Sequence, residues 1–282
     1  MNDRLKVALA EMKEGEFLPL SAIGPSAFDS AFLGNALDIA SGQSLMHYMR
    51  LDRFKTLLKN KAIYMRRLDL FDLDPHEGRF PAANASQQSS LTRGLAEQLG
   101  FAVNSLKGHR DFIEGAMRKL TYVHCWFGWD NEDQQMWDEY GDRGCGVCVR
   151  TTARRLHEAL GRLPDFTANL CGVTYSGDEQ PIAEIISFLA ACRKRPQFSH
   201  EREIRLIGQL GDKTWQASYT QNGLSTPDHQ FLAVNLERLF ERVYVGPSAS
   251  DTTFQEIEAL ANKAAGCRVV HRSSLSPSPT PQ

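Results

Sequence analysis

The chain has 282 residues, of which 42% are hydrophobic and 23% are charged, and its formal net charge is −2. This composition is ordinary for a globular protein, and the near-zero charge argues against a generic electrostatic grip on nucleic acid or on an anionic membrane. No apolar run approaches the roughly 20 residues of a membrane-spanning helix, and the amino-terminal segment lacks the apolar core of a signal peptide. Six cysteines without regular spacing favour reduced thiols over a disulfide framework, so we expect a cytoplasmic protein.

In chain order, hydrophobic spacing and turn residues predict helices and strands that follow each other irregularly. This irregular order favours an α+β fold: a single domain with a mixed or mostly antiparallel sheet flanked by helices. Helices are expected over residues 5–12, 52–59, 85–120, 134–140, 152–163, 182–195 and 251–264. Strands are expected over residues 62–66, 122–127, 146–150, 172–175, 200–207, 230–236, 243–245 and 268–271.

We divide the chain into an amino-terminal helix and extension over residues 1–40, an α+β domain over residues 41–272, and a tail over residues 273–282. The tail alternates serine with proline and is expected to be disordered, because such a composition buries too little apolar surface to offset the entropy of ordering.

The segment with the most distinctive chemistry is 198–207. Because side chains alternate along a strand, Glu201, Glu203 and Arg205 are expected on one face of the sheet. Two adjacent carboxylates repel each other, and such a pair often raises one pKa or binds a cation, while Arg205 could relieve the repulsion. The same pattern also fits a solvated or salt-bridged face, so both interpretations stay open.

A second segment concentrates aromatic side chains. Trp126, Trp129, Trp137 and Tyr140 lie within 15 residues of one another, although the chain has only four tryptophans. Such a cluster can stack on a planar ligand such as an adenine or nicotinamide ring, and it is equally typical of an aromatic core.

A third segment, 47–50, contains Tyr48 and Arg50 close to the start of a helix. A basic side chain there could clamp a phosphate, or it could be an ordinary surface arginine. The turn that follows the next strand ends at Glu77, and we count Tyr48, Arg50 and Glu77 among the candidate ligand-binding residues.

Several motifs fail on inspection. Cys145 and Cys148 have the spacing of a zinc or redox pair, but no second pair follows, and they lead into a strand where a redox pair would open a helix. There is no Gly-rich phosphate loop, no His-Glu-x-x-His and no Gly-x-Ser-x-Gly motif. The sequence therefore predicts no metal site.

The order of these segments resembles a bacterial family known as domain-of-unknown-function family 2971, over roughly residues 45–275. The family's motifs are matched in order by the Asp72-to-Glu77 turn, the Cys125-Trp126 strand, Met136-Trp137 with Tyr140, Gly146-Val147, Val173 to Tyr175, the run from Lys194 through Phe198 to Arg205, and Val243 to Pro247.

The resemblance brings no established activity, but the outline of the family is similar to small ADP-ribosyltransferase-like domains. On that fold-level analogy, NAD would be a substrate, Glu203 would be catalytic, Glu201 would orient the acceptor and Arg50 would hold the phosphates of NAD. The same analogy groups the remaining candidate ligand-binding residues around the nucleotide: Tyr48, Glu77, Trp126, Trp137, Tyr140 and Arg205.

Three hypotheses follow. The first is an NAD-using, ADP-ribosyltransferase-like enzyme in defence or toxicity. The second is a non-catalytic ligand-sensing or protein-interaction module in which Glu201, Glu203 and Arg205 form a structural network. The third is a Mg²⁺-dependent nuclease or RNA-modifying enzyme, which only the two acids support. We expect a small-molecule ligand, no membrane and no generic nucleic-acid binding, and the sequence does not identify a protein partner.

Overall fold

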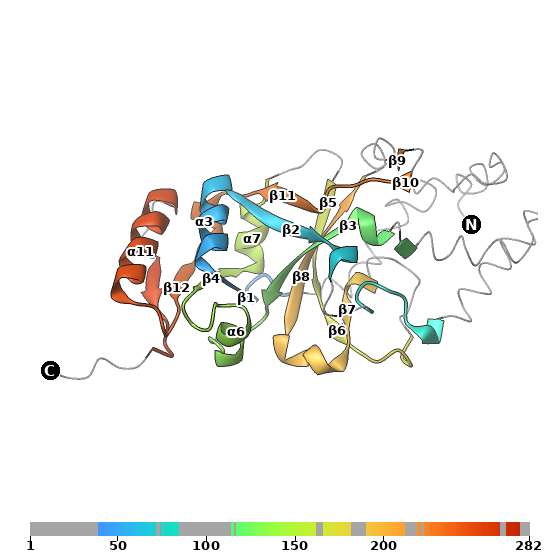
Figure 1. Cartoon of the computed structure of the whole chain (residues 1–282), viewed down its shortest axis with the longest axis horizontal. Helices are drawn as coiled ribbons and strands as arrows, with labels where there is room; N and C mark the ends of the chain where they lie inside the picture. The colour runs from blue at the N-terminus through green and yellow to red at the C-terminus, as the bar shows by residue number, and fades with distance from the viewer. Residues whose placement is uncertain are drawn as a thin grey trace, which may run out of the picture.

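A nine-stranded, mostly antiparallel sheet organises the part of the chain that the structure describes (Figure 1). Its strands follow the order β11-β2-β3-β1-β4-β12-β13, while β8 pairs with β3 and β5 pairs with β8. The computed structural model describes residues 39–71, 74, 76–84, 114–115, 117–161, 166–181, 190–211, 219–220, 223–265 and 269–276.

The strands of this sheet are β1 (Ser44–Met49), β2 (Ala62–Arg67), β3 (Thr121–Phe127), β4 (Val147–Thr152), β5 (Phe166–Gly172), β8 (Glu203–Leu210), β11 (His229–Ala233), β12 (Arg242–Val245) and β13 (Val270–Arg272). Two small ladders lie beside it: β6 (Thr174–Tyr175) with β7 (Arg193–Lys194), and β9 (Tyr219–Thr220) with β10 (Gly223–Leu224). The pairs β12–β13 and β6–β7 are parallel, and the others are antiparallel.

Over the described residues, the helices are α3 (Leu51–Asn60), α6 (Gln134–Glu139), α7 (Ala153–Ala159), α10 (Leu236–Leu239) and α11 (Asp251–Ala265), with 3-10 turns η3 (Leu68–Leu70), η4 (Ala82–Asn84) and η5 (Pro196–Glu201). None of the helices in the described part of the chain is long and apolar enough to cross a membrane.

The sheet divides at β3. Along one edge, β8 pairs with the whole of β3. Along the other edge, β2 pairs with it only at Tyr122 and Val123, and β1 only at Phe127. The two strands therefore diverge from a shared edge, and the residues of β3 between them pair on that side with no strand of the described residues.

The described residues form three apolar clusters, and the period-two alternation of β1 divides its side chains between two of them. Leu45 and Met49 of β1 join the main core, to which α3, α7, α10 and α11 contribute Phe54, Leu156, Leu239 and Ile257. Met46 and Tyr48 point the opposite way, into a smaller aromatic cluster that includes Phe127 and Trp137. The α+β fold expected from the sequence is confirmed, as one domain with a mixed, mostly antiparallel sheet.

The strand expected over 200–207 begins later than predicted. Residues Pro196–Glu201 form the 3-10 turn η5, and Arg202 has a left-handed backbone with φ of 40°. This kink separates Glu201 from the strand, so the prediction that Glu201 shares a strand face with Glu203 was wrong.

The helix predicted over 182–195 was wrong at its carboxyl end, where Arg193 and Lys194 form β7 beside β6. The proline at 196 disfavours helical geometry only in the residue before it, and Arg195 is extended, with φ of −67° and ψ of 149°. The strand expected over 172–175 is split between the end of β5 and the start of β6. The helices expected over 5–12 and over most of 85–120 lie outside the described residues.

One other expectation needs correction. Cys171 and Cys192 form a disulfide, where reduced thiols were expected, because two segments 21 residues apart in sequence meet at β5. The disordered tail expected over residues 273–282 stays a prediction; of its residues, Ser273 is 4% exposed and its backbone N–H donates to the carbonyl of Val245 at 2.8 Å. Residues 277–282 lie outside the described residues.

Candidate functional site

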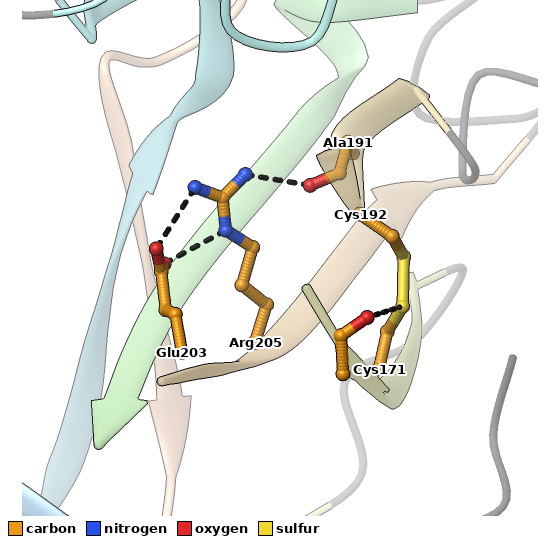
Figure 2. The surroundings of a disulfide bond; sticks show 6 residues. Cys171, Ala191, Cys192, Glu203 and Arg205 are labelled. Carbon is orange, nitrogen blue, oxygen red and sulfur yellow. Dashed lines mark hydrogen bonds and ion pairs between the residues drawn. A yellow bond between two sulfur atoms is a disulfide. The ribbon is translucent and has the colours of Figure 1, made fainter. Parts of the chain in front are cut away.

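Arg205 is the centre of a buried ionic network at the start of β8. Its Nε donates to Oε1 of Glu203 at 2.7 Å, and its Nη1 donates to the carbonyl of Ala191 at 2.6 Å. Its Nη2 donates to Oε2 of Glu203 at 3.2 Å and also to the carboxylate of Glu77. All three nitrogens of the guanidinium therefore donate to protein partners, of which Figure 2 shows Glu203 and Ala191. Glu203 and Arg205 meet because they are two residues apart on one strand face.

Lys194 extends the network outward from Glu203. Its Nζ donates to Oε2 of Glu203 at 3.3 Å and to the carboxylate of Glu201. The hydroxyl of Tyr140 donates to Oε1 of Glu201 at 2.9 Å, and Tyr140 is 38% exposed. The left-handed turn at Arg202 brings both acids to one ammonium group, although only Glu203 belongs to the strand.

The network has one more acid than base, because three carboxylates surround one guanidinium and one ammonium. Burial alone would raise the pKa of Glu203, but Arg205 and Lys194 outweigh it and hold that pKa below its usual range. Burial likewise works against the charge of Lys194, and the glutamates reverse this and raise its pKa. For Glu77, burial outweighs the nearby cations and raises the pKa. Glu203 is therefore held as an anion, and Glu77 is the acid of the pair that takes up a proton more readily.

Two further side chains contact Glu203. Its backbone N–H donates to the hydroxyl oxygen of Tyr175 at 2.7 Å. The thiol of Cys125, opposite Arg205 on β3, lies beside it, and burial raises the pKa of that thiol. The hydroxyl of Tyr175 thus anchors the backbone of Glu203, while the Cys125 thiol adds a polar partner to its carboxylate.

The disulfide holds the chain that supplies the network's outer partners. Cys171 closes the end of β5, and Cys192 lies between Ala191, which accepts from Arg205, and the strand that carries Lys194 (Figure 2). The bond therefore fixes this segment against β5 and β8.

The structure brings together five of the residues that the sequence singles out: Glu77, Tyr140, Glu201, Glu203 and Arg205. Each is joined to the next directly or through Lys194. The carboxylates and the guanidinium are nearly inaccessible, however, and only Tyr140 has a substantial exposed surface.

The other predicted residues lie elsewhere. Arg50 precedes α3, is exposed and pairs with Asp52 at 3.3 Å, so its only described ion pair is with a neighbour in sequence. Tyr48 and Trp137 pack edge to face at 4.9 Å inside the aromatic cluster, and Trp137 is fully buried, which leaves no face for a stacked ligand. Trp126 belongs to the main core, on the sheet face opposite Glu203.

Sequence reasoning missed Lys194 and Tyr175 as members of the network, and it also missed the role of His47 and His124. Lys194 lies seven residues before Glu201 in the sequence, but the helix predicted there did not indicate that its side chain points toward Glu201. Nothing in the local pattern ties His47 to His124, which are 77 residues apart and meet only where β1 and β2 diverge from β3.

In comparisons with protein-family models, with curated proteins and with solved structures, none matches this chain. The resemblance to domain-of-unknown-function family 2971 therefore stays a prediction. Among the described residues, no group of three or more His, Cys, Asp or Glu side chains is placed to hold a metal ion.

Proposed function

We propose that this chain is a non-catalytic, small-molecule-binding module and that its buried Glu/Arg network is a structural element. The observation that supports the proposal is the state of Glu203. Its oxygens accept from Arg205 and Lys194, and its side chain is 3% exposed. A substrate would have to displace an ion pair to reach this carboxylate, whereas a general base or a transition-state stabiliser must lie within hydrogen-bond reach of the reacting group.

Energetics favour the same interpretation. Arg205 is fully buried, and removing one partner of a buried ion pair typically costs about 3–5 kcal/mol because it leaves the other charge unpaired. The network joins β8 to β7 through Lys194, to the carbonyl of Ala191 and to the turn that carries Glu77. Catalytic acids, by contrast, are commonly neutral or stabilising on removal.

The second candidate function is an NAD-using transferase of the ADP-ribosyltransferase type, which acts in defence or toxicity. A specific observation favours keeping it: Glu201 and Glu203 share the ammonium of Lys194, and the partly exposed Tyr140 bonds the outer acid. In this alternative, Glu201 and not Glu203 would contact NAD.

Nicotinamide release from NAD tests both candidates. We would compare the wild-type protein with Glu203→Gln, Glu201→Gln and the exposed control Glu258→Gln, each checked by thermal melting. The proposal predicts no release above background from any of them. Release by the wild type that a folded Glu203→Gln variant loses would contradict it, and loss confined to Glu201→Gln would establish the second candidate.

A further inference from the structure

Two histidines fill the place where the sheet divides. His47 of β1 and His124 of β3 have ring centroids 4.2 Å apart, and the indole of Trp126 lies 5.6 Å from the first and 5.2 Å from the second. Three polar-edged rings from two strands thus form one cluster, on the sheet face opposite the ionic network.

The backbone determines the tautomer of both imidazoles. Nδ1 of His47 lies 2.9 Å from the carbonyl of Cys125, and Nδ1 of His124 lies 2.9 Å from the carbonyl of Tyr64. A carbonyl can only accept, so each Nδ1 carries the hydrogen and each Nε2 is left with a lone pair. These two carbonyls belong to strand edges that pair with no other described strand at the division, so the rings take the place of ladder bonds there.

The hydrogen bond to a backbone carbonyl uses only one of the two nitrogens of each imidazole ring. Burial lowers the pKa of His47 to about 4, and burial together with the neighbouring His47 lowers that of His124, so both are neutral at pH 7. Among the described residues, neither Nε2 has a hydrogen-bond partner, although both rings are partly exposed. The cluster therefore offers two acceptors that no described side chain uses.

Trp126 adds a hydrogen-bond donor beside these two acceptors. Its Nε1–H is buried and has no hydrogen-bond partner within the described part of the chain, in a residue that is 3% exposed. An unmade bond at a buried donor is costly, and most such groups in native proteins are paired. A ligand acceptor that reached this indole would remove that cost.

We propose that His47, His124 and Trp126 form a binding site for a small neutral ligand that carries a primary carboxamide. The hydrogen-bonding groups of a carboxamide match those of the site in number and in kind. Its NH₂ has two donors for the two Nε2 atoms, and its carbonyl accepts from the indole. A carboxylate of the same shape brings only acceptors and meets two lone pairs. This inference deepens the proposed function, on which it rests, by naming the class of ligand.

The test is binding of nicotinamide to the full-length protein, followed by calorimetry and by tryptophan fluorescence, with nicotinic acid as the matched control. We expect nicotinamide to bind and nicotinic acid to bind at least roughly tenfold more weakly, because a mismatched hydrogen-bond set is costly. Equal binding of the two, or no binding of nicotinamide at millimolar concentration, would overturn the proposal without any variant.

Variants then locate the site. His47→Phe and His124→Phe keep a ring and remove its acceptor, and each is expected to weaken nicotinamide binding roughly tenfold. His157→Phe, on the exposed side of α7, should leave it unchanged. Folded variants that bind like the wild type would contradict the site. If nicotinamide binding fails these tests, the structural role of Glu203 is unaffected. If the protein instead releases nicotinamide from NAD, the proposed non-catalytic function is wrong even if nicotinamide itself binds.

Discussion

Replacing Arg205 with methionine should destabilise the protein severely. The side chain is fully buried, and its loss would leave Glu77 and Glu203, which are 3% and 4% exposed, with Lys194 as their remaining cation. It would also leave the carbonyl of Ala191 without the 2.6 Å bond from Nη1. Because one partner of a buried network is removed while the others stay, we expect a loss of about 3–5 kcal/mol in the free energy of unfolding.

Urea denaturation followed by circular dichroism measures this loss, with Arg242→Met as the exposed control. At a few degrees per kcal/mol, the melting temperature should fall by roughly 10 °C, while the control should stay within about 0.5 kcal/mol of the wild type. Adding Glu203→Gln to Arg205→Met should cost less than the sum of the single changes, because the two groups contact each other. A folded Arg205→Met variant within about 1 kcal/mol of the wild type would refute the reasoning.

Three further predictions concern the rest of the molecule. Reduction of the Cys171–Cys192 bond, or Cys171→Ser, should lower stability by about 3 kcal/mol for a closed loop of this length; unchanged melting under reducing agent would contradict it. The His47 ring takes up a proton near pH 6.5 when unfolded but near 4 when folded, so the unfolded state binds more protons between these values. The contribution of His47 to the free energy of unfolding is therefore complete above pH 6.5 and falls by about 2 kcal/mol toward pH 4, once the partial exposure of the ring is allowed for. The variant His47→Phe should lose this pH dependence of stability, and a slope identical to that of the wild type would disprove the prediction. A thiol reagent should label exposed Cys145 in the folded protein and buried Cys148 only after unfolding, as peptide mass mapping would show; equal labelling rates would count against the fold.

The sequence predicts a structural feature correctly where residues close to it in the chain determine that feature. Alternation along β8 correctly places Glu203 and Arg205 on one face, and apolar spacing finds α3, β3 and α11 to within a residue or two. The position of Glu201 was not predictable in this way, because a left-handed residue at 202 breaks the alternation and nothing in its side chain signals that.

The partners of these residues could not be read from the chain. Glu77 reaches Arg205 across 128 residues, and only the pairing of strands decides that contact. For the same reason, Arg50 and Trp137 looked alike as candidates for binding a nucleotide. The fold leaves the first exposed on the surface and buries the second against Tyr48.

The free energy of unfolding of Glu203→Gln, measured beside Glu258→Gln, tests the structural role of the network most directly. A structural carboxylate that balances Arg205 and Lys194 predicts a loss of about 3 kcal/mol or more for Glu203→Gln and almost none for the exposed control. A Glu203→Gln variant as stable as the wild type, or more stable, is the behaviour of an acid held in place for chemistry, and it would contradict the account.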